Sequence, residues 1–284
     1  MASTTLRANC KVNLSLRITG VLPNGYHTLD SLFLPLPEPY DLLRITPSEE
    51  PGLTLTCSDS ALDPRDNTLT RAYRLYAEAN SFFPPLTIML KKGIPSGAGL
   101  GGGSSDAAVL LRYLNSKPQR ALDAKALNAV ALHVGADVPF FLQDCPCRVR
   151  GTGDALEPYM PGLTGFWLTL VCPDVKVATS WAYTAWDTLH PLSSSHNLTT
   201  QVSEAKESCF RFHCQNDLEE AVFPDYPELA HIKRELFRQG AAAAVMSGSG
   251  ASQLGLFRDQ HAAKNAAAFF HARGMQTYYH ALSC

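Results

Sequence analysis

The sequence predicts an α+β fold in two domains, and three observations indicate it. Residues 8–18 alternate between apolar and polar side chains, as a half-buried strand does. A glycine-rich stretch at 95–105 lies between an apolar run and a helix-like run. Prolines and a glycine interrupt the pattern near residue 160, and strands and helices follow in mixed order. We therefore expect an N-terminal domain over 1–160 and a C-terminal domain over 161–284.

The composition is that of a globular chain with a substantial core. The 284 residues are 45% hydrophobic and 18% charged, and the formal net charge is −2. No basic stretch stands out, so nucleic acid and anionic membranes are poor candidate partners. No apolar stretch approaches the roughly 18 residues of a membrane span, and the N-terminus lacks the apolar region of a signal peptide. We expect a soluble, cytoplasmic protein.

The N-terminal strand carries the first candidate site residues, Lys11 and Asn13. In the segment ANCKVNLSLRI, apolar side chains occupy every second position from Val12 to Ile18. Because side chains alternate across a strand, Lys11 and Asn13 project together from the other face. An ordinary strand with one solvated face gives the same alternation, so both interpretations stay open on this pattern alone.

A turn follows this strand and presents an aromatic ring and an imidazole. Asn24 and Gly25 form a tight-turn signal, and Tyr26 and His27 come directly after them. These two side chains can stack on a base and hydrogen-bond it. A packed loop tyrosine and a surface histidine would leave the same sequence pattern, and that alternative also stays open.

Residues 95–105, PSGAGLGGGSS, hold five glycines and predict a phosphate-binding loop. An apolar run at 86–90 precedes the loop and a helix-like run at 106–114 follows it. Glycine permits positive φ and close approach of backbone N–H groups to an anion, and a helix N-terminus adds partial positive charge. Ser104 and Ser105 stand where the helix begins, so we expect their hydroxyls to cap it. A mobile glycine linker is disfavoured by the sharp apolar boundaries on both sides.

Other classes of glycine loop do not fit the context. Gly97, Gly99 and Gly102 match the spacing of a dinucleotide-binding loop, and Asp123 follows about twenty residues later, where that loop has an acid. Asp123, however, lies in a segment with helical spacing, so no second strand presents it. No lysine follows the glycines as in a Walker loop, and the His-Arg-Asp and Asp-Phe-Gly motifs of protein kinases are absent. The loop must therefore bind phosphate mainly through its backbone, with a cation from elsewhere in the chain.

An aspartate in an apolar segment is the next candidate. Asp137 stands in HVGADVPFFLQ, between Gly-Ala and Val-Pro-Phe-Phe. An ionised carboxylate is costly to bury without a partner, so Asp137 is a helix cap, a paired charge or a proton acceptor. Pro139 just beyond it indicates a turn at the end of the preceding helix, which keeps the capping alternative open.

The C-terminal part predicts short strands and helices around a second loop of small residues. This loop, SGSGAS at 247–252, is weak evidence of a site when taken alone, because Gly and Ser are common in turns between strands. The expected elements are a strand at 166–171, a helix at 227–239, two short strands around the loop, a helix at 260–273 and a strand at 275–281.

The eight cysteines predict neither a disulfide framework nor a structural metal. Two clusters exist, Cys145 with Cys147, and Cys209 with His213 and Cys214. Neither has a second pair at zinc-ribbon spacing, so we expect scattered reduced thiols and no protein-bound metal.

In their order along residues 11–257, these motifs resemble the GHMP small-molecule kinases. The resemblance rests on the Lys11 strand, NGYHTL, PSGAGLGGGSS, GADVPFF and GSGAS. NGYH and GADVP resemble, within that family, the kinase that acts on a cytidine diphosphate sugar alcohol of the non-mevalonate route to isoprenoid precursors. The resemblance implies a two-domain α+β fold with the active site in the cleft between the domains, and ATP carrying Mg²⁺ as the phosphoryl donor.

The resemblance also implies catalytic and ATP-binding roles. Asp137 stands at the position of the base that accepts the substrate hydroxyl proton, and Lys11 at that of its cationic neighbour. Phosphoryl transfer needs an aligned nucleophile and stabilisation of the moving charge, which a base and an ammonium supply. Asn67 and Lys92 stand where the adenosine part is contacted. The remaining ATP-binding residues are Pro95, Ser96, Gly97, Ala98, Gly99, Leu100, Gly101, Gly102, Gly103, Ser104 and Ser105.

For the acceptor substrate, the resemblance implies a second set of residues. Asn13, Tyr26 and His27 match positions that hold the cytidine diphosphate group, and Tyr183 matches an aromatic over the cytosine. Thr179 is a weaker substrate candidate. The family usually has alanine where this chain has Cys10, which should face away from Lys11.

Two alternatives remain at this point. Another GHMP-type kinase, acting on a homoserine- or mevalonate-like alcohol, would bind ATP alike and ignore cytidine. A catalytically silent nucleotide-binding module would be expected to lose Lys11 or Asp137, and both are present. The sequence leaves the oligomeric state open.

Overall fold

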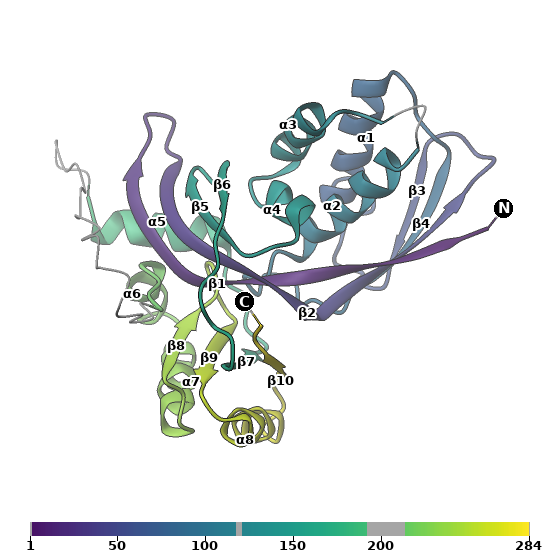
Figure 1. Cartoon of the computed structure of the whole chain (residues 1–284). Helices are drawn as coiled ribbons and strands as arrows, with labels where there is room; N and C mark the ends of the chain where they lie inside the picture. Colours follow the sequence, from purple (N-terminus) through teal and green to yellow (C-terminus); the bar gives the residue numbers. More distant parts are fainter. Residues whose placement is uncertain (1, 118–120, 192–213, 284) are drawn as a thin grey trace. The chain divides into compact units, whose positions relative to one another are not determined.

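The computed structural model describes residues 2–117, 121–191 and 214–283. The chain divides into two compact units that interleave along the sequence. This division differs from the single boundary predicted near residue 160, because strands β1 (Thr4–Val21) and β2 (His27–Pro47) run through both units (Figure 1). Unit 1 comprises Met1–Lys11, Pro35–Pro95 and Gly101–Cys145, and unit 2 comprises Val12–Leu34, Ser96–Leu100 and Pro146–Cys284.

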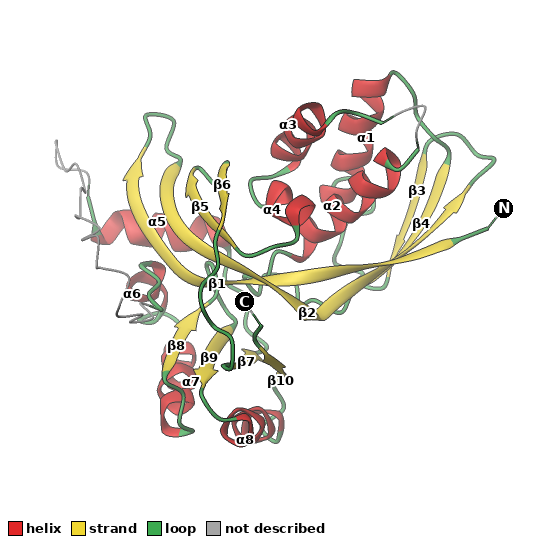
Figure 2. Ribbon diagram, viewed as in Figure 1, coloured by secondary structure: helices red, strands yellow, loops and turns green. Residues whose placement is uncertain are grey.

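Unit 1 combines a small sheet with a group of helices. The end of β2 pairs antiparallel with β4, with Leu42 opposite Lys91, and β3 pairs parallel with β4. In Figure 2, α1 to α4 lie together beside these strands. The elements are β3 (Leu53–Cys57), α1 (Thr68–Asn80), β4 (Leu86–Lys91), α2 (Gly102–Asn115), α3 (Ala124–Val134) and α4 (Val138–Gln143).

Local capping explains where two of these helices begin. Asn67 caps α1 in a capping box, in which its side chain accepts from the Thr70 N–H and the Thr70 hydroxyl accepts from the Asn67 N–H. Asp123 caps α3 and accepts from the Ala126 N–H at 2.8 Å. Asp123 is therefore a helix cap, in agreement with its exclusion as a ribose-binding acid.

Unit 2 holds an antiparallel sheet in the order β10-β7-β9-β8, with α7 and α8 packed on it (Figure 2). These elements confirm the strands and helices that the sequence predicts after residue 160. In the same unit, β2 pairs with β5 through Leu29–Phe33, and β5 pairs with β6. The elements are β5 (Cys147–Gly151), β6 (Ala155–Pro158), β7 (Trp167–Cys172), α5 (Thr179–Leu189), α6 (Leu218–Val222), α7 (Pro227–Arg238), β8 (Ala243–Met246), β9 (Gln253–Phe257), α8 (Gln260–His271) and β10 (Gln276–Ala281).

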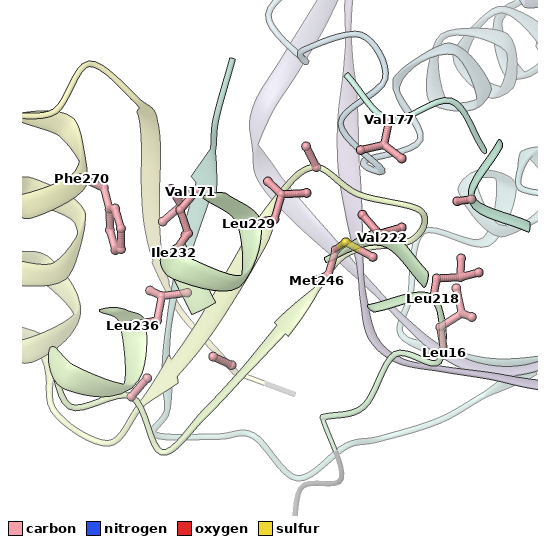
Figure 3. Close-up of a cluster of buried hydrophobic side chains, with 14 of the residues drawn as sticks. Leu16, Val171, Val177, Leu218, Val222, Leu229, Ile232, Leu236, Met246 and Phe270 are labelled. Atoms are coloured by element: carbon pink, nitrogen blue, oxygen red, sulfur yellow. The ribbon is translucent and has the colours of Figure 1, made fainter. Parts of the chain in front are cut away.

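The core of unit 2 is a cluster of buried apolar side chains (Figure 3). Leu229, Ile232 and Leu236 recur at helical spacing on α7 and face Val171 and Phe270. Removing one such buried side chain typically costs about 2–5 kcal/mol of stability. This packing gives the α5 and β8–β9 segments, which carry candidate site residues, a rigid support.

No helix in the described part of the chain is long and apolar enough to span a membrane. Cys209 and His213 lie outside the described residues. Among the residues that are described, no group of His, Cys, Asp and Glu side chains is arranged to hold a metal ion.

Candidate active site

The glycine loop is built from alternating left-handed residues. Gly97, Gly99 and Gly101 have φ values of 71°, 73° and 72°. A Cβ on Gly99 would lie 2.1 Å from the carbonyl oxygen of Ser247, so this position excludes every side chain. The Ser247 hydroxyl donates to the Gly99 carbonyl at 3.0 Å, and the Ser252 N–H donates to the Ala98 carbonyl at 3.2 Å. The second small-residue loop therefore supports the first half of the glycine loop.

Helix α2 begins directly at the end of this loop, without a side-chain cap. Gly101 is the N-cap residue, and the first helical bond runs from the Ser105 N–H to the Gly101 carbonyl. The prediction that Ser104 and Ser105 cap the helix is wrong, because the helix starts at Gly102 and both serines lie inside its first turns. The N–H groups of the first turn have no intrahelical acceptor, and glycine leaves them open to an anion.

Lys11 and Asp137 form an ion pair beside the start of α2. The Lys11 ammonium lies 3.4 Å from the Asp137 carboxylate; the Lys11 side chain is 5% exposed and that of Asp137 is 32% exposed. Asp137 is the N-cap residue of α4, but its side chain makes no capping hydrogen bond; the structure shows it as a paired charge. A Cβ on Gly101 would lie 3.2 Å from Lys11 Cγ, which brings the lysine stem against the helix N-terminus. A cation, a carboxylate and a backbone cradle thus meet within unit 1.

The strand that carries Lys11 and Asn13 is not an ordinary strand with one solvated face. Both side chains are buried, and so are their apolar neighbours. The Asn13 backbone N–H donates to the Ser247 hydroxyl at 3.1 Å, and the Asn13 side-chain amide nitrogen donates to the Ser31 hydroxyl at 2.9 Å. Buried polar side chains require specific partners, and both Lys11 and Asn13 have them.

The two residues predicted to contact adenosine have local roles in this structure. The Asn67 side chain caps α1 and also donates to the Asp63 carbonyl at 2.7 Å. The Lys92 ammonium lies between the carboxylates of Asp41 and Asp106. An adenosine contact from either residue stays a prediction.

Two residues predicted to bind the acceptor substrate, His27 and Tyr183, come together in unit 2. Their ring centroids are 4.7 Å apart with planes tilted by 33°, and the Trp186 ring meets His27 edge-on at 5.8 Å. The imidazole Nε2 of His27 lies 2.7 Å from the Asp187 carboxylate. Tyr26, in contrast, is 67% exposed at the turn between β1 and β2.

Thr179 lies at the start of α5 and is held by the second small-residue loop. Its hydroxyl is 2.9 Å from the Ser249 hydroxyl. The structure therefore brings Thr179 together with residues 247–252, and Tyr183 lies one helical turn further along the same helix.

Comparison with known proteins agrees with this geometry. The family model of the GHMP kinases N terminal domain matches residues 67–144, and that of the GHMP kinases C terminal matches residues 197–275. The 4-diphosphocytidyl-2-C-methyl-D-erythritol kinase of Nitratidesulfovibrio vulgaris is 46% identical over 281 residues, which are 98% of each chain. The chain belongs to the 4-diphosphocytidyl-2-C-methyl-D-erythritol kinases of the GHMP family.

Solved structures agree with this membership. The crystal structure of a 4-(cytidine 5'-diphospho)-2C-methyl-D-erythritol kinase superposes with a TM-score of 0.77 at 32% identity, covering 97% of this chain and 98% of that one. A homoserine kinase from Cytophaga hutchinsonii superposes with a TM-score of 0.67 at 18% identity, covering 97% and 93%. The second likeness shows the GHMP kinase fold alone.

Sequence reasoning missed several polar residues of this GHMP kinase. Asp187 follows Tyr183 by four positions on α5, and that helical spacing is a signal by which it could have been found. Ser247 was seen only as part of a small-residue loop. Nothing in the sequence around Asp41 and Asp106 distinguishes them from surface acids, because what sets them apart is their burial beside Lys92.

Proposed function

We propose that this chain transfers the γ-phosphoryl group of ATP to the 2-hydroxyl of 4-(cytidine 5'-diphospho)-2-C-methyl-D-erythritol. Its full-length similarity to kinases of that name supports the activity. The single observation that carries the chemistry is the Lys11–Asp137 pair, 3.4 Å apart, beside the uncapped N-terminus of α2.

On the donor side, the ATP phosphates bind the glycine loop and the start of α2. Backbone N–H groups and the helix dipole are preorganised for an anion at this place. Mg²⁺ carried by the nucleotide would neutralise part of the phosphate charge. The adenosine part extends toward Asn67 and Lys92.

At the reacting centre, Asp137 accepts the proton of the substrate 2-hydroxyl while the oxygen of that hydroxyl attacks the γ-phosphorus of ATP. The carboxylate is partly exposed, so a substrate hydroxyl can reach it. Lys11 donates hydrogen bonds to the transferring phosphoryl group and, at 3.4 Å, orients the Asp137 carboxylate. The products are ADP and the 2-phosphate of the sugar alcohol.

On the acceptor side, aromatic stacking selects cytosine. Tyr183 and Tyr26 hold the faces of the base, and His27 hydrogen-bonds its edge. Asn13 and Thr179 contact the diphosphate sugar alcohol. The expected location of the enzyme is the cytoplasm, where ATP and small phosphorylated metabolites are available.

The test measures ADP release by a coupled assay with Mg-ATP and one acceptor at a time. The cytidine diphosphate sugar alcohol should support turnover, and ³¹P NMR should identify a new phosphomonoester at the 2-position. Homoserine and mevalonate, the acceptors of the alternative GHMP-type kinases, should leave ADP release at the background rate. Turnover with either of them alone would assign the chain to another kinase, and ATP binding with no acceptor would make it a silent module.

A further inference from the structure

A second, largely buried charge cluster lies in unit 1 under the start of α2. It consists of Asp41 on β2, Lys92 after β4 and Asp106 on α2, with side chains 0%, 12% and 2% exposed. The Lys92 ammonium pairs with Asp41 and lies 3.0 Å from Asp106. A Cβ on Gly102 would lie 3.3 Å from the same ammonium, so the cluster supports the first residue of α2.

The cluster also fixes the segment that leads into the glycine loop. The Asp41 oxygen that does not face Lys92 accepts the N–H groups of Gly93 and Ile94 at 2.6 and 2.8 Å. Ile94 in turn lies 3.0 Å from where a Cβ on Gly102 would be. Asp41, Lys92 and Asp106 therefore join β2, the loop entry and α2 at the base of the phosphate cradle.

The charges of this cluster do not balance when all three groups are ionised. Two carboxylates and one ammonium give a net charge of −1 in a buried place, which is costly. Asp106 is the less satisfied acid, because its Oδ1 is buried without a hydrogen-bond partner among the described residues. Burial raises the pKa of Asp106 to about 7, the charge of Lys92 opposes this rise, and the charge of Asp41 adds to it.

The charged groups that act on Asp106 come from two elements around α2. Lys92 lies after β4, and Asp41 lies on β2. Helices α1 and α3, which also pack against α2, carry the charged residues Arg71, Arg74, Glu78 and Lys125, and α4 carries none; the groups that act on the pKa of Asp106 are Lys92 and Asp41. The protonation of Asp106 is thus governed by this cluster and by whatever charge binds at the helix start.

We infer that Asp106 is a proton-linked positioning residue, which takes up a proton from solvent when the nucleotide phosphates bind at the start of α2. Asp106 lies four residues after Gly102, about 6 Å along the helix axis at 1.5 Å per residue. Negative phosphate charge at that distance disfavours the ionised form of Asp106. When Asp106 is protonated, the charges of Asp41 and Lys92 balance and the net charge of the cluster is zero. The inference rests on the proposed function only for the place of the ATP phosphates.

The test is calorimetry of Mg-ATP binding, without acceptor, at pH 7 in buffers of different ionisation enthalpy. The dependence of the observed heat on buffer enthalpy gives the number of protons taken up. Wild type should take up a substantial fraction of a proton, and the isosteric variant Asp106→Asn should take up none. Asp137→Asn is the matched control, because it removes the exposed acid near the phosphates and should keep the uptake.

A second measurement keeps the inference falsifiable if Asp106→Asn does not fold. In wild type and Asp137→Asn, the Kd for Mg-ATP should rise several-fold from pH 6 to pH 8, as Asp106 loses its proton. If the cluster had only a structural role, Asp106→Asn would change the affinity for Mg-ATP without changing the number of protons taken up on binding. Equal uptake in Asp106→Asn, or binding by wild type with no uptake and no pH dependence, would overturn the inference and leave the proposed function intact. Absence of Mg-ATP binding to wild type would overturn both.

Discussion

Two lysines flank the start of α2, and their acidic partners differ in exposure. Lys11 pairs with Asp137, whose side chain is 32% exposed. Lys92 pairs with Asp41 and Asp106, whose side chains are 0% and 2% exposed. An acid that solvent reaches can also be reached by a substrate hydroxyl, whereas Asp41 and Asp106 are closed to a substrate and support the segment around the start of α2. Exposure, more than residue type, separates the pair assigned to chemistry from the cluster assigned to support.

The largest effect is expected at the partly exposed Lys11–Asp137 pair. Asp137→Asn keeps the shape of the side chain and removes the base, so kcat should fall by about 10² to 10⁴. The KM values for both substrates should change far less, because the base acts in the transition state. Steady-state kinetics measures this, with circular dichroism as the control for folding. An Asp137→Asn enzyme within tenfold of wild type would remove the distinction between the two pairs.

The same comparison predicts how a double variant behaves. Lys11→Met keeps the stem of the side chain and removes the ammonium, and it should also lower kcat. Because Lys11 and Asp137 serve one step, the combined variant should lose less than the product of the two single losses. A double-mutant cycle on kcat tests this. Strictly multiplicative losses would mean that the two residues act independently.

The next effect concerns the hydrogen-bonded pair His27–Asp187 and the Tyr183 ring packed against His27. Tyr183→Ala should raise the KM for the cytidine diphosphate substrate by about 5- to 150-fold, equivalent to about 1–3 kcal/mol of base stacking. Tyr183→Phe keeps the ring and should behave nearly as wild type. A raised KM for ATP with an unchanged KM for the cytidine substrate would assign this aromatic to the other substrate.

A smaller effect is expected in the glycine loop. Gly99→Ala places a methyl group 2.1 Å from the Ser247 carbonyl oxygen at a φ of 73°, and it should weaken Mg-ATP binding about tenfold or more. The matched control is Gly52→Ala, which has a φ of 87° and open space around its Cβ. Both variants carry the backbone strain of about 1–2 kcal/mol, so only the clash separates them. Calorimetry that finds the same ATP affinity in both would show that the contact with Ser247 does not shape the loop.

The last effect concerns the pH dependence of stability at the buried Asp41–Lys92–Asp106 cluster. The pKa of Asp106 is raised to about 7 from an ordinary value of about 3.9, chiefly by burial. Its contribution to stability is therefore fully present below about pH 4 and is lost as pH rises through about 7, by at most about 1.4 kcal/mol per pH unit. Asp106→Asn should remove this dependence. Urea unfolding at pH 5 and pH 8 measures it, and parallel stability changes in wild type and variant would contradict a raised pKa.

The sequence was sufficient wherever the signal is local. Alternation along β1, helical spacing in α7 and α8, and the glycines of the phosphate loop depend on near neighbours in the chain, and the structure has these elements where the patterns predict them. The long strand β2 and the helix α1 left weaker local signals and were not predicted. The serine caps of α2 were predicted wrongly, because the helix begins on Gly101 and Gly102 without a side-chain capping hydrogen bond.

Burial and long-range pairing were decided only by the tertiary structure. The sequence gives Lys92 no obvious partner. The antiparallel register of β2 and β4, with Leu42 opposite Lys91, brings the next residues, Asp41 and Lys92, together, and packing of α2 adds Asp106. The sequence reads the same whether a charged side chain is surrounded by water or is buried beside a carboxylate. Only the fold removes the water, and with it comes the difference between an acid that can react and one that must be held neutral or paired.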